Sequence, residues 1–315
     1  MNSLLIKARR TLFGVSLDEV TLARRGFHAT SESQRIRLER IGGTFLAGYH
    51  AALEESSLSR LETLLNAIEL EYRGFAFEGA GMALALLDLV TPWKGSRVDA
   101  LLRGPGDAHI YMVHVGVGWA FARAPFGTMT AFRRLDPILR WLALDGYGFH
   151  EGYFHWSPET PNRRPRFDGY RARAFDQGLG RSLWFVAGSD VGRIAGLVSQ
   201  FDATRHADLW SGAGLACAYA GSLDRETIET LRVLAGRFAP NLAQGAAFAA
   251  KARQRAGNPA QHTELACQVL CGVSAPTAAG ITDLAFERLP ANGEGTGFET
   301  WRQRIAASFA QEILA

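Results

Sequence analysis

A carboxylate stands next to glycines inside an apolar stretch of the chain. Glu78 lies in the segment Arg73 to Leu89 (RGFAFEGAGMALALLDL), where Phe75 and Phe77 precede it and small and aliphatic residues follow. An ionised carboxylate is costly in apolar surroundings, so such a residue is either paired for structural reasons or part of a site. Burial would raise its pKa and would suit it to general acid or base catalysis.

Three more side chains in similar motifs could transfer protons: His150 and Glu151 in GFHEGYF, and Asp176 in FDQGLGR. We expect these three and Glu78 to carry proton transfer. The residues expected to contact a substrate belong to the same motifs and are Phe77, Gly79, His114, Trp119, Gln177, Arg181, Trp210, His262 and Glu264. For each acid and histidine a structural alternative stays open, namely that it binds a neighbouring helix end.

The spacing of these residues argues against metals and cofactors. HEGYFH resembles the metalloprotease helix motif, but its second histidine, His155, is five residues from His150 instead of four. The Gly-x-Gly sequences at 116–118 and 178–180 are too short for a dinucleotide fingerprint and follow no strand. We therefore predict no metal and no cofactor, and reduced core thiols for the cysteines.

The segments that carry these residues have the hydrophobic spacing of helices. Leu58, Leu61, Leu65 and Ile68 recur at helical spacing, and strand-type alternation is nearly absent between residues 41 and 275. A second kind of helix is rich in glycine and small residues, in the segments FLAGYHAAL, FEGAGMALAL, HVGVGWAFAR, GFHEGYFHW, FDQGLGRSLWF, WSGAGLACAYA, AQGAAFAAKAR and HTELACQV. One glycine of each of the first seven gives the series Gly48, Gly79, Gly116, Gly152, Gly178, Gly212 and Gly245. This period of roughly thirty residues is typical of tetratricopeptide-like helical hairpins.

A longer repeat is superimposed on this period. FEGAGMALAL matches WSGAGLACAYA 133 residues further on (212 − 79). HVGVGWAFAR matches AQGAAFAAKAR at an offset of 129 (245 − 116), and FLAGYHAAL matches FDQGLGRSLWF at 130 (178 − 48). With GFHEGYF and HTELACQ as a fourth pair, Glu78, Glu151, Ser211 and Glu264 fall at equivalent points. The prediction is an all-α helical-hairpin array with two related halves. Its parts are an N-terminal arm (1–40), a first half (41–156), a basic proline-rich linker loop (157–173), a second half (174–275) and a C-terminal cap (276–315) with a short strand at 286–289.

The composition indicates a globular protein and argues against membrane-spanning and nucleic-acid-binding classes. The 315 residues are 47% hydrophobic with a net charge of +3, which suits a packed globular protein and gives no basic arm for nucleic acid. No apolar run reaches the ~20 residues of a membrane span, and the first thirty residues show no signal sequence. We expect a cytoplasmic protein with no integral membrane segment and no nucleic-acid partner.

Several long motifs together resemble a known family. RGFAFEGAGMALALLDL, YMVHVGVGWAFAR, LDPILRWLALDGYGFHEGYF, AFDQGLGRSLWF and DLWSGAGLACAYAG are similar to the bacterial family called domain of unknown function 1702, over roughly residues 10–305. Some members of that family lie in gene clusters for enediyne antibiotics, near the polyketide synthase that makes a linear polyene. The resemblance implies a role in building or handling an unsaturated polyketide. It implies a hydrophobic polyene or polyketide molecule as ligand, with the synthase or other pathway enzymes as candidate partners.

Two functions remain open from the sequence. In the first, the protein is a cofactor-independent enzyme that cyclises or isomerises a polyene by proton transfer in an apolar groove. In the second, it is a non-catalytic helical-repeat protein that holds the polyene or docks partner enzymes.

Overall fold

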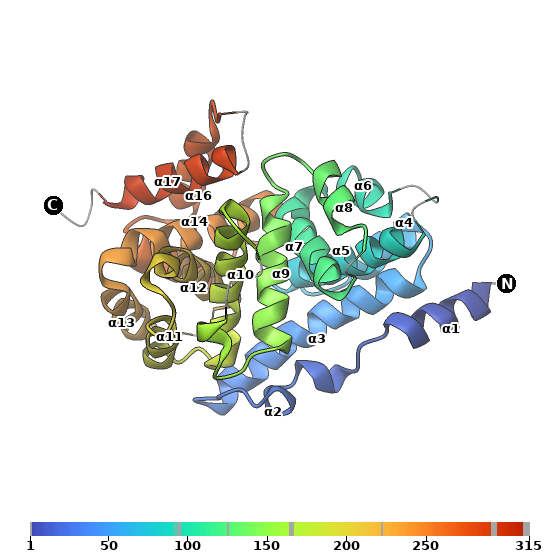
Figure 1. The fold of residues 1–315 in the computed structure, drawn as a ribbon, viewed down its shortest axis with the longest axis horizontal. Coiled ribbons are helices and arrows are strands. Elements are labelled where there is room, and N and C mark those ends of the chain that lie inside the picture. Colours follow the sequence, from blue (N-terminus) through green and yellow to red (C-terminus); the bar gives the residue numbers. More distant parts are fainter. Residues whose placement is uncertain are drawn as a thin grey trace.

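The computed structural model describes residues 2–91, 93, 96–124, 126–163, 167–221, 223–290 and 295–310. Within these ranges the chain is helical and contains no strand, which confirms the predicted all-α class (Figure 1).

One row of helices forms the inner part of the molecule, and each packs on the next. In order they are α3 (Glu32–Glu54), α5 (Arg73–Val90), α7 (Ile110–Arg123), α9 (Trp141–Phe154), α10 (Tyr170–Val186), α12 (His206–Ala220), α14 (Ala239–Ala256) and α16 (Ala275–Phe286). In Figure 1 the row runs from α5 and α7, through α9 and α10 at the centre, to α12 and α14. Seven of the eight predicted glycine-bearing segments lie in this row.

Shorter helices connect the inner ones and lie outside them. They are α4 (Leu58–Asn66), α6 (Arg97–Leu102), α8 (Thr128–Arg134), α11 (Val191–Val198), α13 (Arg225–Ala235) and α15 (Gln261–Leu270). Between α9 and α10 the described residues form only the 3-10 turn η4 (Thr160–Asn162), in the predicted linker, whose Pro165 lies outside the described ranges. Four inner helices therefore precede the linker and four follow it, an arrangement consistent with two related halves.

The fourth pair in the predicted repeat is wrong. HTELACQ lies in α15, which is a connecting helix, and the fourth inner helix of the second half is α16. The strand predicted at 286–289 is also wrong, because Phe286 is the last residue of α16. A short apolar run cannot be assigned to strand or helix by periodicity alone.

The ends of the chain cover the row of inner helices. At the N-terminus α1 (Asn2–Phe13), η1 (Leu17–Val20) and α2 (Leu22–Arg25) pass along α3, and at the C-terminus α17 (Thr296–Ala310) packs on α14 and α16 (Figure 1). The remaining 3-10 turns are η3 (Asp107–His109), η5 (Ala203–Arg205) and η6 (Gly236–Phe238).

Paired glycines allow the inner helices to touch through their backbones. In α5, a Cβ on Gly79 would lie 2.0 Å from the carbonyl oxygen of Phe45 in α3, and one on Gly81 would lie 2.8 Å from that of Val113 in α7. The first glycine of each Gly-x-Gly thus faces the preceding inner helix and the second faces the next one. The same arrangement holds at residues 116 and 118, 146 and 148, 178 and 180, and 212 and 214.

This contact pattern corrects the predicted series of glycines. In α9 the equivalent of Gly116 is Gly146, which meets the Val115 carbonyl oxygen, whereas a Cβ on Gly152 would meet the Ser182 side chain. The steps around α9 become 30 (146 − 116) and 32 (178 − 146) residues, which are more regular than the predicted 36 and 26.

Side-chain caps fix the start of four connecting helices, α4, α6, α11 and α13. The Oγ of Ser96 accepts a hydrogen bond from the Asp99 N–H (3.0 Å) at the start of α6. We expect Ser96→Ala to lower the free energy of unfolding by about 1 kcal/mol, because it leaves that N–H without its cap. Urea denaturation followed by circular dichroism measures the change, and an unchanged midpoint would contradict the assignment.

Taken singly, the helices in the described ranges are too short or too polar to cross a membrane. By length and composition only the pair α15 and α16 would suffice together, and these two are bent by 67°.

Candidate functional site

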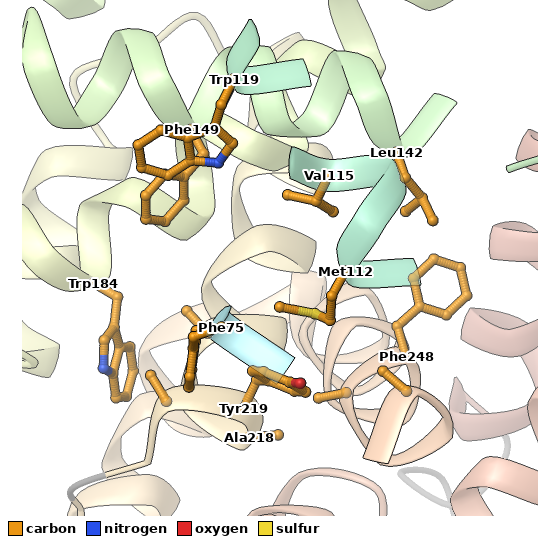
Figure 2. Packing of buried hydrophobic residues seen from close by; sticks show 14 of the residues in the cluster. Phe75, Met112, Val115, Trp119, Leu142, Phe149, Trp184, Ala218, Tyr219 and Phe248 are labelled. Carbon is orange, nitrogen blue, oxygen red and sulfur yellow. The ribbon is translucent and has the colours of Figure 1, made fainter. Parts of the chain in front are cut away.

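The inner helices and η1 line a cavity whose walls are largely apolar and include eight aromatic side chains, and we call it the aromatic cavity. Its lining residues come from η1, α3, α5, α7, α9, α10 and α12 and are Val20, Ile41, Gly42, Phe45, Leu46, Phe75, Glu78, Met112, Trp119, Phe149, Tyr153, Phe154, Arg181, Phe185, Leu215, Ala216, Tyr219 and Ala220. Figure 2 shows Trp119 with Phe149, and Phe75 with Tyr219; in both pairs the ring centroids are 5.1 Å apart. The lining contains two charged residues, Glu78 and Arg181.

Glu78 is fixed by the indole of the neighbouring inner helix. Trp119 Nε1 donates a hydrogen bond to Glu78 Oε1 (3.0 Å), and Arg181 Nη2 lies 3.7 Å from the same oxygen. Burial raises the pKa of Glu78 to about 7, although the Arg181 charge and the Trp119 N–H both act to lower it. The protonated and ionised forms are therefore both populated near neutral pH.

Arg181 is shared with a second buried acid. Its Nη1 lies 2.9 Å from Asp145 Oδ1, and both residues are buried. Burial also raises the pKa of Asp145, against the opposing effect of Arg181. One guanidinium therefore faces two carboxyl groups in a low-dielectric interior, an arrangement that favours a proton on one of them.

The polar residue before the first glycine recurs along the inner helices. This position holds Glu78 in α5, Asp145 in α9, Gln177 in α10, Ser211 in α12 and Gln244 in α14, all of them buried. Ser211 Oγ donates to Gln244 Oε1 (2.7 Å), which also accepts from Arg302 Nε of α17 (3.4 Å). The array thus carries a line of buried polar groups, and Glu78 is the one that faces the aromatic cavity.

A second cavity adjoins the first. It is lined by residues of α7, α9, α10, α12, α14 and α17, and it shares Met112, Arg181, Leu215 and Tyr219 with the aromatic cavity. The free volumes are about 60 Å³ and about 30 Å³, enough for a few atoms each. Together the cavities contact seven of the eight predicted glycine-bearing segments; the exception is HTELACQV in α15.

Three of the predicted site residues meet in the aromatic cavity: Glu78, Trp119 and Arg181. Two others lie close by. Gly79 is at the contact with Phe45, and the ring of His150 lies edge-on to Trp119, with centroids 5.7 Å apart.

The other predicted site residues do not line this cavity. Asp176 binds Arg205 in a buried ion pair, with Arg205 Nε 2.9 Å from Asp176 Oδ2. Phe77 stacks on His109, and His114 Nδ1 is bonded to the Ile110 carbonyl oxygen (2.7 Å) in its own helix. Gln177 belongs to the polar line, and Trp210 is buried among the packed helices.

His262 and Glu264 lie on the connecting helix α15. His262 lies between Arg37 and Arg253, with a ring nitrogen 3.2 Å from each guanidinium, and Glu264 accepts from the Ala275 N–H (2.8 Å) at the start of α16. Glu264 and Glu151 therefore do not occupy positions equivalent to Glu78, contrary to the predicted alignment, whereas Ser211 does.

Asp145 was not among the predicted site residues. The sequence DGYG at 145–148 suggests a helix end, but α9 continues through it to Phe154. The available signal was the polar-Gly-x-Gly pattern that DGYG shares with EGAG, QGLG and SGAG. Tyr219, Phe45 and Met112 were missed because their type is common in any helical core.

A separate polar cluster occupies the C-terminal end of α9. Glu151 Oε1 lies 3.3 Å from His150 Nδ1 and 3.3 Å from His155 Nδ1. His150 is buried, Glu151 is half-buried and His155 is exposed. These are the residues of the described chain that could hold a metal ion.

Fold and site define an all-α array of helical hairpins with a protonatable acid in an aromatic interior. The chain belongs to the family described as protein of unknown function DUF1702, whose model matches residues 4–309. No curated protein and no solved structure matches it.

Proposed function

We propose that the protein takes part in natural-product biosynthesis of the enediyne polyketide type. In this proposal it binds a polyene or polyketide intermediate in the aromatic cavity and promotes its isomerisation or cyclisation by proton transfer from Glu78. One observation carries the proposal: the carboxyl group of Glu78, with a pKa of about 7, faces a cavity whose walls are otherwise largely apolar and aromatic.

The geometry suits movement of a double bond. Trp119 and Arg181 both contact Oε1 of Glu78, so Oε2 is the oxygen that we assign to proton exchange. The carboxylate takes a proton from an allylic carbon and exchanges it with solvent. The double bond shifts, and the same carboxyl group delivers a solvent-derived proton further along the chain. No electron leaves or enters the substrate, so the step needs no oxidant or reductant. Arg181, between the two cavities, would stabilise negative charge that develops on a substrate oxygen.

The aromatic cavity must widen before it can bind a polyene. A free volume of about 60 Å³ does not admit a long polyene until side chains of the wall move. The half-buried lining residues are Gly42, Phe154 and Leu215, so Phe154 and Leu215 are the side chains that we expect to swing outward. Because Trp119 lies in the wall, its fluorescence should report the binding of a conjugated chain.

The test uses a conjugated tetraene carboxylic acid as the probe, in D₂O. We expect the wild-type protein to bind the probe, seen as energy transfer from tryptophan, and to place deuterium at the carbon that receives the proton. Glu78→Gln should keep binding but lower deuterium incorporation by about 100-fold or more, the usual contribution of a general acid or base. The matched control is Glu62→Gln, which changes an exposed glutamate on α4.

Two results would contradict proton transfer by Glu78. Deuterium incorporation by Glu78→Gln at the wild-type rate would assign the chemistry to another group. Tight binding with no incorporation by the wild-type protein would favour the alternative, a non-catalytic protein that holds the polyene or presents it to the polyketide synthase or other pathway enzymes.

A further inference from the structure

The cluster at the C-terminal end of α9 has the donor set of a metal site. The imidazoles of His150 and His155 and the carboxylate of Glu151 supply two nitrogens and one oxygen, and their donor atoms all lie within 4.8 Å of one another. Two histidines with one glutamate are a known ligand set for zinc, in sites that leave the fourth position open.

In the metalloprotease motif one helix carries both histidines. Here α9 ends at Phe154, and His155 is the residue that follows the helix, with φ −121° and ψ 19°. Its N–H still donates to the Glu151 carbonyl oxygen (2.9 Å), and its side chain meets Glu151 at the four-residue spacing of helical neighbours. Glu151 therefore contacts both histidines, although these are five residues apart.

The distances, which include a hydrogen bond between His150 and Glu151, are also compatible with a shared ion. Each histidine nitrogen is 3.3 Å from Glu151 Oε1, longer than the ~2.8 Å of a charge-assisted hydrogen bond. An ion placed ~2.05 Å from both atoms of such a 3.3 Å pair sees them at an angle of about 107°, close to tetrahedral. A small rotation of the exposed His155 side chain brings the third donor within reach.

The buried half of the cluster is held in place. The His150 ring packs on Phe154, with centroids 4.8 Å apart, and edge-on to Trp119. A ligand that is already oriented loses little freedom on binding, which favours metal capture. We propose that His150, Glu151 and His155 form a binding site for one zinc-type divalent cation, independent of the proposed chemistry at Glu78.

The affinity should be lower than that of closed structural zinc sites. Glu151 brings the one formal negative charge among the three ligands, and the guanidinium of Arg123 acts on His150. With three protein ligands, water would fill the fourth position.

Calorimetric titration of the EDTA-treated full chain with Zn²⁺ tests the site. We expect one equivalent to bind to the wild-type protein, and His155→Ala and Glu151→Gln each to weaken binding by about tenfold or more. His155 is exposed, so its removal should leave the circular dichroism spectrum and the unfolding midpoint unchanged. The matched control is His28→Ala, which removes a histidine that lies beside one carboxylate, Asp190 (3.7 Å), and should bind zinc like the wild type.

Cobalt(II) gives a second readout. A four-coordinate site produces an intense visible absorption that the His155→Ala variant should lack. Failure of the wild-type protein to bind one equivalent of Zn²⁺, or equal binding by His155→Ala, would overturn the proposal. Because the readout is metal binding, neither result depends on whether Glu78 transfers protons.

Discussion

Gly48→Ala should destabilise the protein by about 3 kcal/mol or more, at the upper end of overpacking effects. The new Cβ would lie 2.0 Å from the carbonyl oxygen of Ala76 and 2.7 Å from its Cα, and both are backbone atoms that cannot rotate away. The two helices α3 and α5 must therefore separate. Because Phe45 and Leu46 of α3 line the aromatic cavity, we also expect weaker binding of the polyene probe.

Gly43 in the same helix provides the matched control. A Cβ at Gly43 meets nothing within 4 Å, so Gly43→Ala should instead stabilise the protein by about 0.5–1 kcal/mol, the usual gain of alanine over glycine in a helix. Urea unfolding of both variants gives the comparison. Equal effects of the two substitutions would show that the backbone contact between α3 and α5 does not govern stability.

Glu78→Gln should raise the stability of the protein at alkaline pH by about 3 kcal/mol relative to wild type. The pKa of Glu78 is about 7 in the folded protein against 4.5 for an ordinary glutamate, so folding retains a proton that the unfolded chain releases. Wild-type stability therefore falls as pH rises from about 4.5 to 7, by about 3 kcal/mol for such a difference in pKa. Glutamine cannot ionise and escapes this loss, while it can still accept the hydrogen bond from Trp119.

The sign of this effect can be checked by unfolding both proteins at several pH values. Below pH 4.5 the two should be about equally stable, and the advantage of the variant should grow up to pH 7 and then remain constant. Asp145 also has a raised pKa and shares Arg181 with Glu78, so the measured difference belongs to this coupled pair of acids. A variant that is less stable than wild type at pH 8 would mean that Arg181 holds Glu78 ionised. When replacing an acidic residue stabilises a protein, that residue is typically retained for function.

The all-α class could be predicted from the sequence because its signals are local. Helical spacing, caps and the recurrence of glycines with a period of roughly thirty residues follow from backbone geometry and from close packing of neighbouring helices. The errors arose where a local signal allowed two meanings. DGYG at 145–148 was interpreted as a turn although it continues α9, and HTELACQ was placed among the inner helices although it lies in α15.

Which side chains meet was decided by the tertiary structure. Glu78 and Asp145 share Arg181 because α5 and α9 turn their polar positions toward the interior in which α10 places Arg181. The rotation of a packed helix is set by its neighbours. For the same reason Asp176, one residue before Gln177, points to Arg205 and does not line the aromatic cavity, whereas Arg181 of the same helix does. The sequence alone determined a glycine-paired helical array with an acid in an apolar segment. The packing of its helices placed that acid in an aromatic cavity and brought His150, Glu151 and His155 together.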